Sequence, residues 1–218
     1  MNRLNMNDAD CSFDDLLCQS LSLFHQFRFY DDRMEEDNAF KFLREAEKVV
    51  ADNKDGVCVA KLGCVIECLA HRFYINDNTD GILEEEDTFL IKFWKGIKQH
   101  SSEAFIASLW VGEYFLLRLK NPESRFRSRS KKMVSKILSF MADMLRKPEK
   151  QKALTLSSVV VLEETVDLIK EICDMHICEK QLVVLLETLN HLQEIRMLQE
   201  EEDETNNTLR RQMCDFYY

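Results

Sequence analysis

Glycine and proline are scarce in this chain of 218 residues, which holds only five Gly and two Pro. Average usage of about 7% and 5% would give roughly 26 of the two together. Hairpins, tight turns and phosphate-binding loops need glycine because it adopts backbone conformations that other residues avoid. The deficit therefore argues against a β-rich fold and favours long helices joined by short polar links.

Sequence motifs of common catalytic and nucleotide-binding sites are also missing. The chain contains no G-x-x-x-x-G-K-[ST], no G-x-G-x-x-G and no H-E-x-x-H. Each of the five histidines lies in or beside a helical pattern, and none accompanies a glycine-containing turn that would expose a nucleophile. We therefore expect a protein that is not an enzyme and needs no cofactor.

Residues 101–119, SSEAFIASLWVGEYFLLRL, form the most apolar stretch of the chain. Apolar residues occupy nearly every side of this helix, and such a helix is usually buried on nearly every side. Its apolar part, interrupted by Glu113, is shorter than the roughly 20 residues needed to cross a bilayer. Asn121-Pro122 should end it, because proline cannot continue a helix. We predict a central helix and no membrane association.

Amphipathic stripes elsewhere predict an all-α fold of about eight helices in antiparallel pairs. The first helix should start at a capping-box-like pattern from Ser12 to Asp15. Pairs begin near residues 12, 56, 101 and 154, at intervals of 44, 45 and 53 residues. This spacing resembles a short HEAT/armadillo-type array, whose units run about 40–47 residues. The alternative is a globular helical bundle around the helix at 101–119.

The predicted organisation is a single domain with two extensions. Residues 1–11 should be disordered, residues 12–200 should form one helical domain, and residues 201–218 should form an acidic tether with an aromatic end. The β-branched segment 155–162, TLSSVVVL, could also form a strand. Because no second strand pattern is present to pair with it, we predict a helix there.

Eight cysteines and no signal-peptide pattern indicate reduced thiols in the cytoplasm or nucleus. Two groups, Cys64, Cys68 and His71, and Cys173, His176 and Cys178, have the residue types that zinc prefers. The tight C-x₂-C spacing is missing, and the first two cysteines belong to an apolar stripe. Buried structural cysteine is therefore the favoured interpretation, with metal binding left open.

Charge is unevenly distributed along the chain, whose net charge is −10. Residues 118–152 hold twelve Lys and Arg against three Asp and Glu, a balance of +9, which leaves −19 for the remainder. The acidic run 84–87 (EEED) is expected to be the solvated start of a helix. Such asymmetry is the one compositional feature that indicates binding partners.

The densest basic run lies in residues 123–132, predicted as a linker before a helix from Met133, in which the basic residues are either extended or in the first turns of a helix. It could dock an acidic protein, contact nucleic-acid backbone, act as a nuclear-import signal, or simply balance the acidic surface of the same molecule. Ser128 and Ser130 within it are candidate phosphorylation positions. The predicted contact residues are Arg125, Arg127, Arg129, Lys131 and Lys132.

The aromatic end Phe216-Tyr217-Tyr218 is the second predicted contact, and with Leu209 and Met213 it could pack back on the domain or enter a groove of a partner. We expect a non-catalytic, intracellular interaction module, a scaffold or adaptor subunit, that binds one or more proteins with an acidic surface. The alternative is a nucleic-acid-associated subunit using the basic patch 118–152. The overall negative charge disfavours that alternative, because it repels phosphate.

Overall fold

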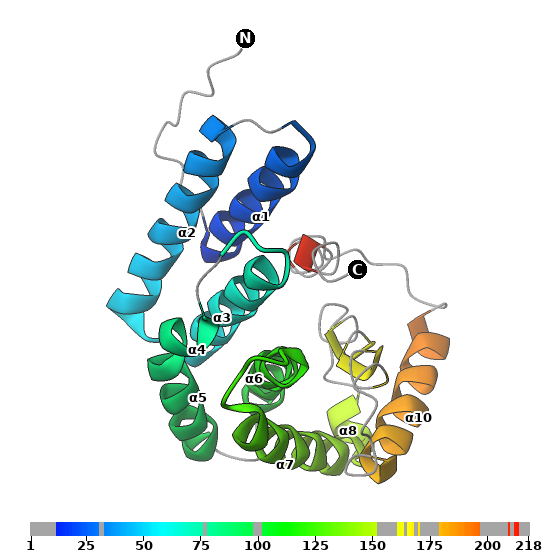
Figure 1. Cartoon of the computed structure of the whole chain (residues 1–218). Helices are drawn as coiled ribbons and strands as arrows, with labels where there is room; N and C mark the ends of the chain where they lie inside the picture. The colour runs from blue at the N-terminus through cyan, green and yellow to red at the C-terminus, as the bar shows by residue number, and fades with distance from the viewer. Residues whose placement is uncertain are drawn as a thin grey trace.

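The computed structural model describes residues 12–30, 33–75, 78–97, 102–151, 161–163, 165–167, 170, 179–196, 209 and 212–213. Within these ranges every regular element is a helix, as Figure 1 shows, and the all-α prediction is confirmed. None of the described helices is both long and apolar enough to cross a membrane. The labelled helices are α1 (Phe13–Tyr30), α2 (Arg33–Asn53), α3 (Gly56–His71), α4 (Thr79–Ile82), α5 (Glu84–Gly96), α6 (Ser102–Lys120), α7 (Arg127–Leu145), α8 (Pro148–Gln151) and α10 (Glu179–Arg196).

Helix α6 is the centre of the fold, and it packs against α3, α5 and α7 (Figure 1). Nearly all of its described side chains from Ala104 to Arg118 are buried; Ile106, 39% exposed, is the exception. The helix ends at Lys120, directly before Asn121-Pro122. The expectation of a buried central helix is therefore confirmed.

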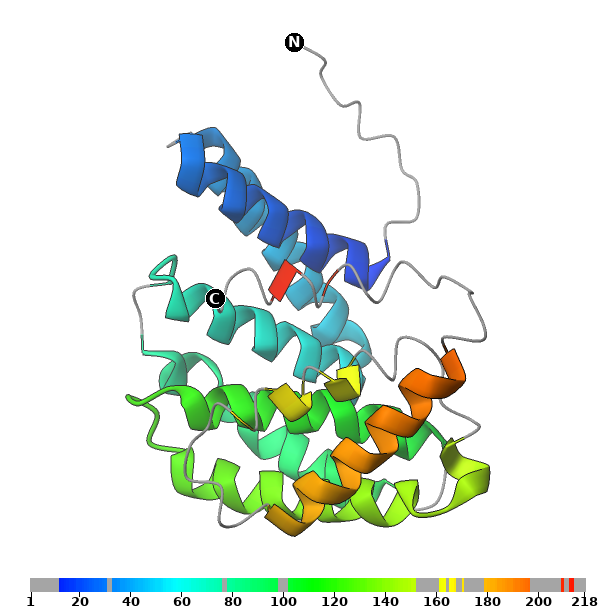
Figure 2. The same ribbon diagram turned by 90° about the vertical axis from the view of Figure 1, so that its right-hand side faces the viewer.

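The α1–α2 pair packs on α3, and α10 packs on α7. Figure 2 shows the α1–α2 pair at one end of the molecule, with α7 and α10 at the other. Ser12 caps α1 as predicted: its hydroxyl accepts from Asp15 N at 3.2 Å, and its own N–H donates to Asp15 Oδ2 at 3.1 Å. Lys61, on α3, donates to Asp14 at 2.6 and 2.8 Å and lies over the Trp110 ring at 4.8 Å, which ties α1, α3 and α6 together.

Three of the four predicted pair starts, near residues 12, 56 and 101, coincide with α1, α3 and α6. The fourth, near residue 154, lies outside the described residues. The resemblance to a HEAT/armadillo array therefore remains a prediction. Residues 161–163 and 165–167 are helical. The prediction of a helix is therefore confirmed for residues 161 and 162, the described end of the β-branched segment 155–162.

The start of α7 differs from the sequence-based expectation. The helix begins at Arg127, six residues before the expected Met133, so most of the predicted basic linker is helical. No glycine or proline interrupts residues 123–132, and Ser130 lies on the buried side of the helix with Met133 and Val134. Four of the five predicted basic contact residues therefore lie in the first two turns of α7.

Candidate partner-binding surface

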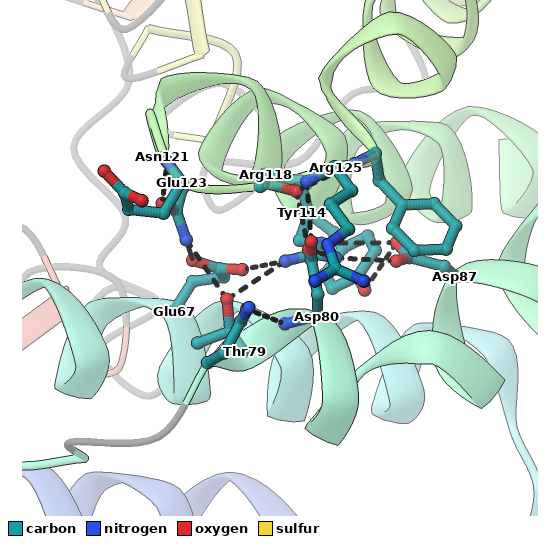
Figure 3. A network of polar contacts seen from close by, with 12 residues as sticks. Glu67, Thr79, Asp80, Asp87, Tyr114, Arg118, Asn121, Glu123 and Arg125 are labelled. Atoms are coloured by element: carbon teal, nitrogen blue, oxygen red, sulfur yellow. Dashed lines mark hydrogen bonds and ion pairs between the residues drawn. The ribbon is translucent and has the colours of Figure 1, made fainter.

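Arg118, in the last turn of α6, has a completely buried guanidinium close to the start of the basic run. Arg118 is 0% exposed, and its Nη1 lies 2.6 Å from Glu67 of α3. Its Nη2 lies 2.7 Å from Asp80 of α4 and 2.8 Å from Asp87 of α5. Figure 3 shows the three carboxylates converging on it. These four residues, called the Arg118 cluster below, connect four helices. Burial of an unpaired arginine would cost several kcal/mol, about 3–5, so the carboxylates are needed for this placement.

Neutral side chains complete the hydrogen bonding of the Arg118 cluster (Figure 3). The Tyr114 hydroxyl donates to Asp87 Oδ1 at 2.8 Å. Asn121 Nδ2 donates to Glu67 Oε2 and to Thr79 Oγ1, both at 3.1 Å. The donors to Asp87 and Glu67 replace water that these carboxylates lost on burial, which is the condition for burying charge in a protein core.

The pKa shifts of the three carboxylates differ because burial acts on all of them, whereas each accepts a different set of hydrogen bonds. Burial raises the pKa of Glu67 and of Asp87 above the usual range, although Arg118 donates to both. Burial pushes the pKa of Asp80 up as well, but donation by the Arg125 backbone N–H and the Ser124 hydroxyl outweighs it. The pKa of Asp80 is therefore lowered, and this carboxylate is the one best held in its charged form.

Asp80 also fixes the connection between α6 and α7. Its Oδ1 accepts from the Ser124 hydroxyl at 2.8 Å, and its Oδ2 accepts from the backbone N–H of Arg125 at 2.6 Å. Asn121 Oδ1 accepts from the Glu123 N–H at 3.0 Å. The connection is thus anchored to the buried cluster through backbone and side chain, which positions the residue at which the basic run begins.

The Phe126 ring links the buried cluster to the surface. The Arg118 guanidinium carbon lies 5.5 Å from the ring centroid, and that of Arg129 lies 5.4 Å from it. Arg127 Nε donates to the backbone carbonyl of Leu119 at 3.1 Å. Cation–π contacts of this kind hold a guanidinium in place and leave its N–H donors available.

The predicted basic contact residues are close neighbours in sequence, from Arg125 in the connection before α7 to Lys132 in its second turn. Four of these side chains are exposed and that of Lys131 is half-buried. We call this group the basic surface; it consists of Arg125, Arg127, Arg129, Lys131 and Lys132. The helix start carries no acidic residue in its first turn, and Phe126 in the N-cap position supplies no side-chain cap. Cations at this end oppose the helix dipole, so helix stability does not explain their presence.

The other predicted contact, Phe216-Tyr217-Tyr218, lies outside the described residues. Nearby, Leu209 and Met213 are buried at 0% and 3% exposure in the main core. Gln212 Nε2 donates to the Ser22 hydroxyl on α1 at 2.9 Å. Of the two possibilities for Leu209 and Met213, packing back on the domain is therefore the one observed.

Cysteine chemistry finds little support in the described part of the chain. Cys64 and Cys68 are buried in the core, whereas His71 is exposed at the end of α3. Desolvation raises the pKa of Cys18 and of Cys58 to about 11, with Asp14 and Asp55 respectively the next cause, so both are thiols at neutral pH. No three His, Cys, Asp or Glu side chains in the described ranges are placed to hold a metal ion. The group Cys173, His176 and Cys178 lies outside those ranges.

Two sequence-based interpretations of charged residues are wrong. Asp87 was expected in a solvated helix start, but it is 0% exposed, unlike its exposed neighbours Glu84 and Glu85. The sequence places Arg118 in the predicted basic patch 118–152, yet it is the most deeply buried cation among the described residues. A signal was present: Arg118 and Glu67 each interrupt a helix that is otherwise apolar on that side, which indicates a buried pair.

Neither protein-family models, nor curated proteins, nor solved structures give a match when compared with the chain. A function for the basic surface is therefore inferred from its residues and contacts.

Proposed function

We propose that this protein is a non-catalytic interaction module, a scaffold or adaptor subunit, whose basic surface binds an acidic surface of a partner protein. The observation that carries the proposal is the anchoring of the basic surface to the Arg118 cluster. Asp80 holds the Arg125 backbone N–H at 2.6 Å, and the Phe126 ring contacts both Arg118 and Arg129. The Arg125 backbone and the Arg127 and Arg129 side chains are already held in place, so they lose less conformational entropy on binding.

Electrostatics supports the choice of an acidic partner. Five cations are grouped at the end of α7 where the backbone dipole adds positive potential, so an anion there is attracted by both. The whole chain carries −10, which repels a long polyanion once the local contact is made. A protein with a compact acidic patch fits this combination better than an extended nucleic acid does.

Charge reversal tests the proposal. The variant Arg125→Glu, Arg127→Glu, Arg129→Glu, Lys131→Glu and Lys132→Glu should lose the partners that the wild type retains in affinity purification followed by mass spectrometry. Its melting temperature should change little, because acidic residues suit the first turn of α7 and offset the lost contact between Arg129 and the Phe126 ring. The matched control reverses five exposed basic residues elsewhere on α2 and α5, with the same change in net charge: Arg33, Lys41, Arg44, Lys92 and Lys95.

A partner retained by the wild type and by the control, but lost from the five-fold variant, supports the proposal. Equal retention by all three proteins contradicts it.

Salt titration then separates a protein partner from nucleic acid. Binding of a duplex DNA probe through five phosphate contacts would give a log–log slope of about −4.5, whereas a protein interface with apolar contacts should give a flatter slope.

A further inference from the structure

Ser128 and Ser130, which alternate in sequence with residues of the basic surface, differ in accessibility. Ser128 is exposed, whereas Ser130 is 0% exposed, on the buried side of α7. Ser124, the other serine of this region, is 6% exposed and its hydroxyl donates to Asp80. Of the three hydroxyls, only that of Ser128 can be reached by an enzyme without opening the fold.

Ser128 is the second residue of α7, where the backbone favours an added negative charge. The first helical hydrogen bonds run from the Arg129 and Ser130 N–H groups to the Phe126 carbonyl, both at 2.8 Å. The N–H groups of Arg127 and Ser128 precede these bonds, at the positive end of the helix dipole. With no acid in the first turn, a phosphate on Ser128 would supply the missing anion.

Basic side chains flank Ser128 on both sides. Arg125 lies three residues before it and Arg127 one before, which is the charge pattern that a kinase with an acidic substrate groove recognises. Lys131 and Lys132 follow at three and four residues, the spacing that places side chains beside each other along a helix. The same cations would attract the kinase and then pair with the phosphate.

We propose that Ser128 is a phosphorylation site that weakens the basic surface. The Ser128 hydroxyl oxygen attacks the γ-phosphorus of ATP held by a protein kinase; the new O–P bond forms as the bond to the β,γ-bridging oxygen breaks. ADP leaves, and the hydroxyl proton passes to solvent. A phosphate of about −2 lowers the local charge from +5 to about +3 and occupies the helix terminus. The effect on partner binding rests on the proposed function above; the modification site itself does not.

The site is tested on the folded full chain with ATP and a purified kinase that prefers arginine three residues before serine. Mass spectrometry should find one phosphate, on Ser128. Ser128→Ala should abolish the incorporation, Ser130→Ala should retain it, and Arg125→Ala should slow it about tenfold. Phosphate on Ser130 in the folded chain, or none on Ser128 of the folded chain while the heat-unfolded chain accepts it, would overturn the assignment.

Stability and affinity test the consequences. Phosphorylated protein should melt about 1–3 °C higher than the unmodified chain, and an unchanged or lower melting temperature would contradict the predicted helix-terminus contact. Affinity for a partner identified by charge reversal should fall at least tenfold. If charge reversal abolishes binding and phosphorylation of Ser128 does not, the proposed regulation of binding by phosphate is wrong, whereas the proposed function is still supported. If neither changes binding, the proposed function is wrong, and Ser128 is a modification site without this role.

Discussion

Two arginines seven residues apart, Arg118 and Arg125, have opposite environments. Arg118 is 0% exposed and makes ion pairs with carboxylates of three other helices. The Arg125 side chain is exposed, and only its backbone N–H is anchored, to Asp80. The difference follows from the neighbours: the Arg118 side chain at the end of α6 is enclosed by α3, α4 and α5, whereas the Arg125 side chain, in the connection before α7, is exposed to solvent. The first arginine holds helices together, and the second can serve a binding partner.

Asp80 belongs to both regions, because it accepts from the buried guanidinium and from the connection that carries the basic surface. Loss of a buried ion-pair partner is costly, since the remaining charges stay desolvated. Loss of an exposed charge changes stability little. Substitutions in the Arg118 cluster should therefore affect stability, and substitutions in the basic surface should affect binding.

The largest effect is expected from Arg118→Met. Three buried carboxylates would lose their shared cation, so the free energy of unfolding should fall by about 3–5 kcal/mol. Arg146→Met is the control, because its partner Asp143 is also exposed and the pair should contribute less than about 0.5 kcal/mol. Urea denaturation of both variants measures the contrast. Similar midpoints for the two would show that the buried cluster does not stabilise the fold.

A smaller loss is expected from Asp80→Asn, which keeps the size of the side chain and removes its charge. Hydrogen bonds to charged groups contribute about 1.5–3 kcal/mol, so unfolding should become easier by about that amount. Hydrogen exchange of the Arg125 N–H should also accelerate. Asp143→Asn, at an exposed position, serves as the control. Unchanged exchange at Arg125 would mean that Asp80 does not position the connection.

A third substitution, Phe126→Leu, removes the ring between the two regions. Its contacts with Arg118 and Arg129 should contribute about 1–2 kcal/mol to stability, most of it from the buried side. Arg129→Ala removes only the exposed contact, so thermal unfolding should show a smaller loss for it. An equal or greater loss for Arg129→Ala would contradict the idea that the buried contact dominates.

The smallest expected effect is a pH dependence, because the carboxylates of the cluster act in opposite directions. Burial raises the pKa of Glu67, so the folded state binds a proton more tightly than the unfolded chain does. This contribution is present at acidic pH and is lost as pH rises through the raised pKa. Asp80, with a lowered pKa, contributes stability that is lost as pH falls. Burial also raises the pKa of Asp87, which therefore acts in the same direction as Glu67, and the three contributions partly cancel in the wild type.

Glu67→Gln isolates the first contribution. Stability of the wild type relative to this variant should increase as pH is lowered from 7 toward the ordinary glutamate range, measured by thermal unfolding. Glu103→Gln, at an exposed position on α6, reports the effect of the same replacement at the surface. A difference between wild type and Glu67→Gln that decreases over this range would show that the pKa of Glu67 is not raised.

Helix periodicity predicted the position of the core better than it predicted which charged side chains are buried. The burial of the helix at 101–119 was predictable because apolar residues on all sides leave no favourable exposed face. The carboxylate partners of Arg118 lie 31, 38 and 51 residues before it in the chain. No local pattern relates positions so far apart, so the pairing of Arg118 with Asp80 and Asp87 could not be predicted, although the apolar surroundings of Arg118 in its own helix indicate burial.

Composition and helical periodicity together were enough to predict an all-α chain, because scarce glycine and proline remove the means to make tight turns while amphipathic stripes remain. The order of the residues also located the basic run. Packing of α3, α4 and α5 against α6 decided which charges are buried and which face solvent. The cost of desolvating a charge depends on partners brought from elsewhere in the chain, and those partners are adjacent only in the folded molecule.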